Sequence, residues 1–367
     1  MTTRLNELES DLIRSMFTGT DTALFEAFAN DLSKDTAEYL TKDLDIDSGN
    51  YIYMLMLGIL GFQKGWDFFP ADMTARIRGI HRYEQVKNTS VTPWLNKQIG
   101  LLKDNGIEVM FTGNAAMRIA FVPDVPRFLN GYDITVHSKD YDKAAELIRD
   151  AALSADKSDF GDRTISGITM IDLHKGVHDR RLFEEESYWN SSAVTEYRSH
   201  QVRVPSFEDQ LIQCLCIPYA HWMLSENKMD RDYRLVSVIQ MLKGRTLDLD
   251  KLASCAQSAG VSCHLRFQMS VLLPYTDSYT GSDLEIVSDD GRYGTYLDKL
   301  IRYRDHASVR NEYQLINTCY RSEEERVSFR RYVADTRNIR SVPDLLRRAK
   351  NRSRSSGSEG KKDNGAE

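Results

Sequence analysis

Two aspartates, each set between apolar residues in a short run typical of a β-strand, are the side chains best suited to chemistry. Asp133 lies in Tyr-Asp-Ile-Thr-Val at 132–136, and Asp172 lies in Ile-Asp-Leu-His at 171–174. Residues two apart in a strand share a face, so each aspartate points away from its apolar neighbours. If the two strands are neighbours in register, the carboxylates can bind one hard cation through oxygen. Because nearby carboxylates repel each other, Mg²⁺ is the expected neutralising partner.

A turn of small residues, Thr112-Gly113-Asn114, precedes Asp133 by one predicted helix. Glycine lets a ligand approach the backbone closely, and backbone N–H groups at the start of a helix attract an anion. We therefore expect this turn to contact phosphate groups. A plain strand-to-helix turn remains the alternative interpretation.

The elements that position these residues are predicted from the hydrophobic period. Residues 107–112, 132–137 and 167–174 have the pattern of strands, and 114–121 and 140–152 have the pattern of helices. Residues 202–205 are expected to form a last short strand. This alternation predicts a small α/β unit (α+β class) with a mixed sheet, which needs helices on its faces to complete a core.

Helical patterns flank this unit on both sides. Residues 1–105 are expected to form an N-terminal helical region, in which 51–62 is a buried helix and 88–93 is a turn. Residues 106–205 are the predicted α/β core. Residues 206–350 are the predicted C-terminal helical domain, which begins at a Ser206 cap and contains a polar loop near 277–298. The tail, 351–367, lacks large apolar residues and is expected to be disordered.

Composition limits the classes of function. A formal net charge of −6 disfavours broad nucleic-acid binding, which normally needs a basic surplus. The five cysteines show no CxxC pair and are odd in number, which indicates reduced thiols in a cytoplasmic protein. The first residues lack the apolar segment of a signal peptide, and the most apolar window, 51–62, is too short to cross a bilayer. No membrane partner is therefore expected.

Taken in order, these pieces resemble an uncharacterised bacterial nucleotidyltransferase-like family with the polymerase β-type fold. The matching segments are Phe-Thr-Gly-Asn-Ala-Ala at 111–116, Arg-Phe-Leu-Asn-Gly-Tyr-Asp-Ile-Thr-Val at 127–136, and Ile-Asp-Leu-His at 171–174. The family reads roughly L-K-G-A-A, R-P-M-x-D-I-D-L-L-V and D/E-L-H-W at these places. The resemblance covers about residues 21–273. It implies Mg²⁺-dependent transfer of a nucleoside monophosphate from an NTP to an acceptor hydroxyl.

The resemblance also implies roles for individual residues. Asp133 and Asp172 would bind Mg²⁺, Asp172 would be the base for the acceptor, and the turn at 112–114 would hold the triphosphate. The chain departs from the family where Gly131 replaces the first of two paired acids and Thr112 replaces the lysine of the glycine turn. Losing a metal ligand weakens two-metal chemistry.

Two functions therefore stay open. One is a nucleotidyltransferase that lacks one metal-binding acid. The other is a catalytically degenerate member of the fold that binds a nucleotide or a protein partner.

Structural alternatives exist for the same side chains. Asp133 could form an ion pair with Arg127 or Arg163 rather than bind a metal. His174 is expected to be hydrogen-bonded locally, as strand-end histidines commonly are. His137 lies about 13 Å along the strand from Asp133, too far to share one ion.

Overall fold

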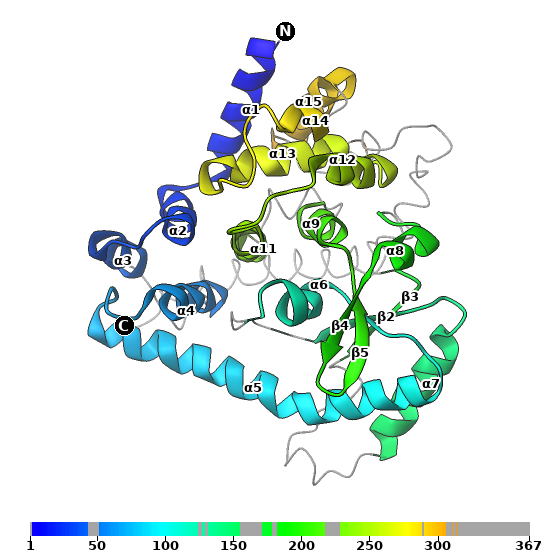
Figure 1. Ribbon diagram of the computed structural model, residues 1–367. Helices are drawn as coiled ribbons and strands as arrows, with labels where there is room; N and C mark the ends of the chain where they lie inside the picture. Colours follow the sequence, from blue (N-terminus) through cyan, green and yellow to red (C-terminus); the bar gives the residue numbers. More distant parts are fainter. Residues whose placement is uncertain are drawn as a thin grey trace, which may run out of the picture.

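The computed structural model describes residues 2–42, 51–123, 127, 129, 131–154, 171–177, 182–216, 228–287, 290–305, 311 and 314. Within them, helices surround a five-stranded mixed sheet (Figure 1). The predicted α+β class is confirmed.

Five described helices precede the sheet in the chain. They are α1 (Thr2–Met16), α2 (Gly19–Ala29), α3 (Lys34–Thr41), α4 (Tyr51–Lys64) and α5 (Ala71–Asp104). The predicted apolar helix is α4, whose residues 54–61 are buried. The long helix α5 runs from the N-terminal helices to the sheet (Figure 1).

The turn predicted at 88–93 is wrong, because α5 continues through it with Pro93 inside the helix. Hydroxyl groups that favour a turn instead bond back to the helix, as when Thr92 Oγ1 donates to the carbonyl of Asn88 at 3.1 Å. Proline removes one backbone hydrogen bond here. The apolar side of α5 nevertheless stays packed on the sheet, through Val91, Trp94, Leu95, Ile99 and Leu102. Burial of this seam outweighs the local turn preference.

The strand order in the sheet is β3-β2-β1-β5-β4. The strands are β1 (Met110–Phe111), β2 (Tyr132–Val136), β3 (Ile171–Lys175), β4 (Ala193–Tyr197) and β5 (His200–Val204). Strand β2 is parallel to β3 and antiparallel to β1, β1 is parallel to β5, and β4 and β5 form an antiparallel pair. Strand β4 was not predicted. Strands β1, β2 and β5 lie at the predicted places with shifted or shorter bounds, and β3 covers the end of the strand predicted at 167–174, whose residues 167–170 lie outside the described residues.

Short helices join the strands. They are α6 (Gly113–Ala116), which continues as a π-helical turn at Met117–Phe121, then α7 (Tyr141–Ser154), α8 (Glu185–Ser191) and α9 (Phe207–Leu215). The predicted cap of α9 is confirmed, because the Ser206 side chain accepts a hydrogen bond from the backbone N–H of Asp209.

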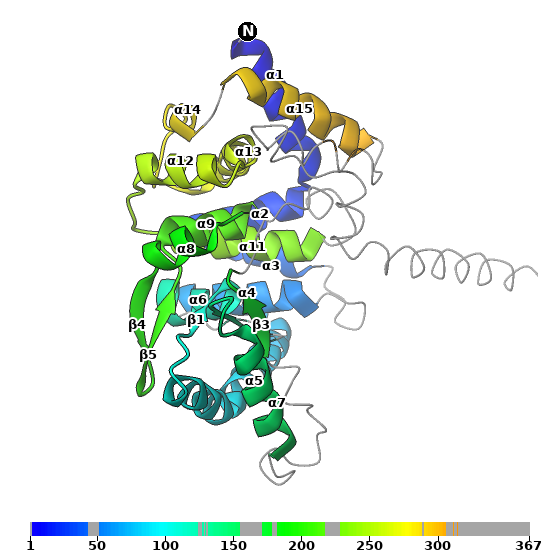
Figure 2. The same cartoon turned by 90° about the vertical axis from the view of Figure 1, so that its right-hand side faces the viewer.

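The two faces of the sheet differ in chemistry. One face is apolar and packs against α5 and α7, through Phe111, Tyr132, Ile134, Val136, Val202 and Val204. The other face carries Asp133, Thr135, Asp172 and His174, which alternate with those apolar residues. Figure 2 shows the sheet between α5 and α7 on one side and α8 and α9 on the other. Helices α8 and α9 therefore cover part of the polar face, while Asp172 on β3 stays exposed.

The chain after α9 is helical over the described residues. Its elements are α11 (Lys228–Leu242), α12 (Leu249–Ser258), α13 (Ser262–Leu272), a 3₁₀ turn η5 (Leu273–Tyr275), α14 (Leu284–Val287) and α15 (Asp290–Asp305). The loop predicted near 277–298 is wrong in its second half, because Tyr293, Tyr296 and Leu297 are buried and hold α15 on the core. N-terminal and C-terminal helices share one apolar core. The predicted tail, 351–367, lies outside the described residues.

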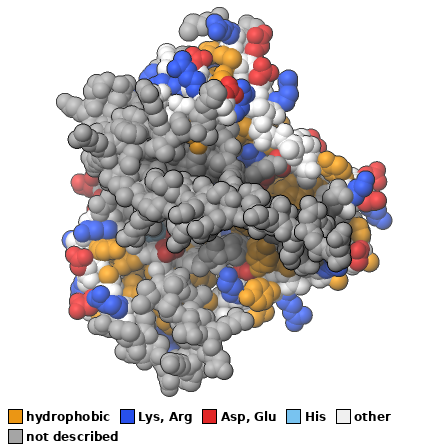
Figure 3. Space-filling view, turned by 180° about the vertical axis from the view of Figure 1, so that it is seen from behind, with side chains coloured by type: hydrophobic (Ala, Val, Ile, Leu, Met, Phe, Trp, Pro, Cys, Tyr) orange, Lys and Arg blue, Asp and Glu red, His pale blue; other side chains and the backbone are white. Residues whose placement is uncertain are grey.

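The described surface mixes charges of both signs. In Figure 3, acidic and basic side chains lie side by side around the margins of the visible face. Among the described helices, none combines the length and the apolar character needed to cross a membrane.

Candidate functional site

Asp133 and Asp172 are direct partners on adjacent strands. In the parallel β2–β3 ladder, Asp133 is paired with Asp172 and Thr135 with His174. Paired residues of a parallel ladder point to the same face, and neighbouring strands lie about 4.8 Å apart. The register on which the proposed carboxylate pair depends is therefore present. Asp172 is exposed, and the Asp133 side chain is 22% exposed.

The Asp133 carboxylate lies between a histidine and the glycine turn. His174 Nε2 is 3.1 Å from Oδ1 of Asp133. On the other side, a Cβ added to Gly113 would lie 2.6 Å from Oδ2 of the same carboxylate. The alternative of an Arg127 ion pair is wrong, because that guanidinium bonds to Ser237 and Gln240 on α11. Arg163, the other alternative, lies outside the described residues.

The turn at 112–114 packs directly against β2. The backbone N–H of Thr112 donates to the carbonyl of Asp133 at 3.0 Å, and Thr112 is fully buried. Gly113 has a φ of +56°, in the left-handed region that favours glycine. Asn114 is exposed. The glycine is thus required both by its backbone angle and by the carboxylate next to it.

The donor set on this face fits Mg²⁺ that arrives with a nucleotide. Two carboxylates supplemented by phosphate oxygens and water are a common Mg²⁺ environment. In the described ranges, no group of three or more His, Cys, Asp or Glu side chains is placed to hold a metal ion. Gly131 lies two residues before Asp133, where a third acid would share its face. The phosphates would have to complete the coordination.

Helices α8 and α9 supply the cover of the polar face, and α8 was not predicted from the sequence. Glu184 caps α8 by accepting hydrogen bonds from the backbone N–H groups of residues 186 and 187. The sequence feature that could have predicted α8 is Glu184, an acidic N-cap, followed by the aromatic residues Tyr188 and Trp189. Tyr188 of α8 is buried against Met110 of β1. On α9, the Gln210 side chain donates to the carbonyl of Gly113 at 3.3 Å.

Tyr188 is a buried phenol close to the site. Burial raises the pKa of Tyr188, and the nearby charges of Asp209 and Asp133 raise it further. Its hydroxyl therefore stays protonated and able to donate. It has no hydrogen-bond partner in the described structure.

His137 belongs to a different cluster at the end of β2. Its ring stacks on Trp189 at a centroid distance of 3.7 Å, and it approaches Glu108 and Glu185 at 3.4 and 3.6 Å. Burial opposes ionisation of Glu185, but hydrogen bonds from Ser138 prevail and lower the pKa of that carboxyl. The partners of His137 are thus Glu108, Glu185 and Trp189 at the end of β2, four residues along the strand from Asp133.

A model of the family described as "Uncharacterised nucleotidyltransferase" matches residues 51–272. This match covers more than half of the chain and includes all five strands. The chain belongs to this family. No curated protein and no solved structure matches it. The matched segment begins at the first residue of α4 and ends at the last residue of α13, so α1–α3 and α14–α15 lie outside the nucleotidyltransferase family segment.

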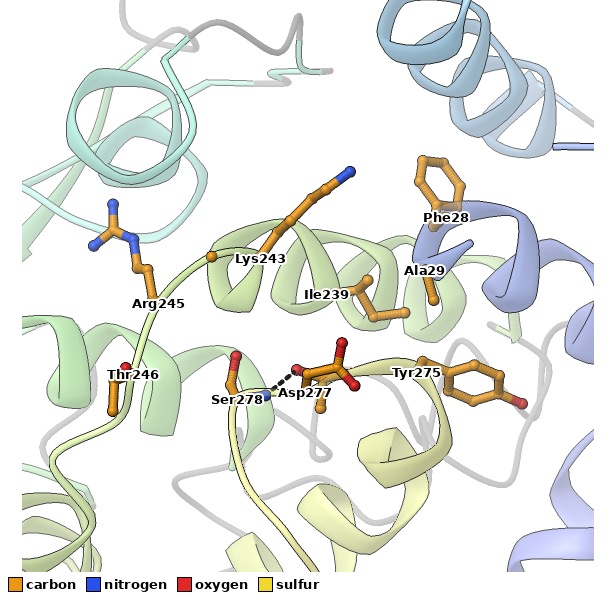
Figure 4. A pocket seen from close by; sticks show the side chains of 11 residues that line it. Phe28, Ala29, Ile239, Lys243, Arg245, Thr246, Tyr275, Asp277 and Ser278 are labelled. Carbon is orange, nitrogen blue, oxygen red and sulfur yellow. Dashed lines mark hydrogen bonds between the residues drawn. The ribbon is translucent and has the colours of Figure 1, made fainter. Parts of the chain in front are cut away.

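A separate pocket lies where the family segment meets these flanking parts. It has a volume of about 380 Å³ and is formed by the end of α2, the end of α11 and the residues after η5 (Figure 4). Phe28 and Ile239 form an apolar floor, and the exposed Lys243 and Asp277 lie at its rim. It shares no lining residue with the Asp133 face.

Proposed function

We propose that this member of the family transfers a nucleoside monophosphate from an NTP to an acceptor hydroxyl in the presence of Mg²⁺. The observation that carries this proposal is the β2–β3 register, which pairs Asp133 with Asp172 beside the glycine turn. Family membership supports the reaction class.

The roles of the residues follow from their positions. Asp133 and Asp172 would hold Mg²⁺, which when bound neutralises charge on the triphosphate. The turn at 112–114 would hold the phosphates through backbone N–H groups. Asp172, the more exposed acid, would accept the proton of the acceptor hydroxyl. The acceptor oxygen then forms a bond to the α-phosphorus as the bond to pyrophosphate breaks.

A second function is favoured by Gly131, which supplies no acid at the strand position where the family has one. A member of the fold with too few metal ligands could keep nucleotide binding after losing transfer. Calorimetry with ATP, CTP, GTP and UTP, with and without Mg²⁺, identifies such a protein. Heat of binding without turnover would favour this function over the first.

The direct test is a transfer assay on the full-length protein. Each of the four NTPs, labelled at the α-phosphate, is incubated with Mg²⁺ and a heat-treated cell extract that supplies acceptors. Label incorporation and pyrophosphate release are measured for the wild type and for Asp133→Ala. We expect incorporation only with the wild type. Equal inactivity of the two proteins for all four nucleotides would rule out the transferase function.

Gly131→Asp is expected to strengthen the metal site. An acid here adds an oxygen ligand on the Asp133 face, so the Mg²⁺ concentration for half-maximal nucleotide binding should fall about 10-fold, the scale on which single groups change metal affinity. Titration of Mg²⁺ against nucleotide binding measures this change. Gly131→Asn, similar in size but uncharged, is the matched control. If both variants behave alike, position 131 does not face the metal site.

A further inference from the structure

Arg127 is a buried cation without a carboxylate partner. Its side chain is among the largest fully buried ones, at 1% exposed. Nη1 donates to the hydroxyl of Ser237 at 2.8 Å, Nη2 approaches the amide oxygen of Gln240 at 3.4 Å, and Cζ lies 5.7 Å from the ring centre of Tyr233. All three partners are neutral, and Nε has no partner. In the described part of the chain, this charge is not compensated by direct contact.

Such an arrangement is unfavourable for the protein alone. A guanidinium removed from water loses hydration that neutral partners replace only in part. Elsewhere in the same fold a buried arginine has a carboxylate counter-ion. Arg231 forms two hydrogen bonds to Asp232, at 2.6 and 2.8 Å. Of these two arginines of similar burial, Arg231 has a carboxylate counter-ion and Arg127 has only neutral partners among the described residues.

The position of Arg127 connects it to the glycine turn. Its partners Ser237 and Gln240 lie on α11, and α11 packs against α9. On α9, Nε2 of Gln210 lies 3.2 Å from Sγ of Cys214 and 3.3 Å from the carbonyl of Gly113. Burial raises the pKa of the Cys214 thiol, while the hydrogen bond from Gln210 and the positive charges of Arg234 and Arg127 act in the opposite direction. Arg127 and the glycine turn are thus connected through two packed helices, α11 and α9.

Tyr188 is a second buried donor without a partner in the same interior region. Its hydroxyl is close enough to Asp209 and Asp133 for their charges to affect it. Buried polar atoms without partners are uncommon in native proteins. A buried cation bonded to α11 and a buried hydroxyl on α8 of this kind favour an anionic ligand over a neutral one.

We infer that Arg127 is kept without a carboxylate partner so that its charge is balanced by the phosphate groups of a ligand bound at the 112–114 turn. The ligand class is a polyphosphate, either free or as part of a nucleotide. This inference rests on the proposed function for the identity of the ligand. It assigns to Arg127 a positive charge that the turn itself lacks, because Thr112 is uncharged.

The test compares Arg127→Met with Arg231→Met in the full-length protein. Calorimetry measures binding of tripolyphosphate, pyrophosphate and the four NTPs, and urea unfolding measures stability. For Arg127→Met we expect at least about 10-fold weaker binding of tripolyphosphate and NTPs, or roughly 1.4 kcal/mol. The urea midpoint should be unchanged or higher, because an uncompensated charge is removed. For Arg231→Met we expect a lower midpoint and unchanged affinity.

The outcomes separate this inference from the proposed function. If Arg127→Met is less stable but binds polyphosphate with unchanged affinity, the role of Arg127 is structural and the inference is overturned. If that variant does not fold, Arg127→Lys decides, since retained charge should retain affinity even where stability falls. Polyphosphate binding that needs Arg127, without any label transfer, supports the inference and overturns the transferase. If the wild type transfers label but binds polyphosphate with the same affinity as Arg127→Met, the transferase function is supported and the inference about Arg127 is overturned.

Discussion

Asp133→Asn is expected to reduce Mg²⁺-dependent nucleotidyl transfer by about 1,000-fold, at the upper end of the loss caused by removing one preorganised electrostatic contact. Asparagine keeps the size of the side chain and can keep a hydrogen bond to His174. It lacks the charge needed to bind a cation together with Asp172. Because the two acids repel each other in the absence of metal, the free energy of unfolding should not fall. Steady-state transfer and urea unfolding measure the two quantities.

Glu196→Gln is the matched control for this variant. Glu196 is an exposed acid on β4, at the opposite edge of the same sheet. It should retain full activity. A loss of activity shared by both variants would indicate a general effect of net charge, and full activity of Asp133→Asn would remove Asp133 from the site.

Gly113→Ala is expected to have the second large effect, because it disturbs the backbone and the carboxylate together. A φ of +56° is strained for alanine, and its Cβ would lie 2.6 Å from Oδ2 and 3.2 Å from Cγ of Asp133. Strain of the backbone alone costs about 1–2 kcal/mol. The collision adds to this and moves the Asp133 side chain, so we expect nucleotide transfer to fall by at least about 100-fold. Urea unfolding and transfer assays check both parts.

Gly106→Ala separates the two causes. Gly106 has a φ of +75°, and no atom lies within 4 Å of a Cβ added there. This variant should lose stability from backbone strain and keep its activity. Combining Gly113→Ala with Asp133→Ala removes the collision, so the two stability losses should be less than additive. Strict additivity would mean that the turn and the carboxylate do not touch.

Much of the site could be predicted because its signals are local. A side-chain period of two placed Asp133 and Asp172 on the polar faces of their strands, and both strands are present with the aspartates paired. The Ser206 cap lies three residues from the group it caps and was predicted correctly. The turn predicted at 88–93 was wrong because the apolar side of α5 is buried against a sheet whose strands come after it in the chain.

Other features depend on which elements pack together. Helix α8 is short, and Trp189 is fixed by donating to the carbonyl of Gly176 at 2.6 Å, a contact that no periodic pattern reveals. Arg127 precedes Asp133 by six residues in the sequence, which made an ion pair plausible. In the structure its side chain instead extends to α11, more than 100 positions further along the chain.

The sequence alone was enough to predict strands β1, β2, β3 and β5, the two aspartates that alternate with apolar residues, and the glycine turn before them. These are properties of neighbouring residues, so periodicity and sterics are sufficient. The tertiary structure alone decided that His174 and Gly113 flank Asp133, that α8 and α9 cover the polar face, and that Arg127 is buried among neutral partners. The partner of a charge depends on the elements that surround it, and those are brought together by burial of apolar surface across the whole chain.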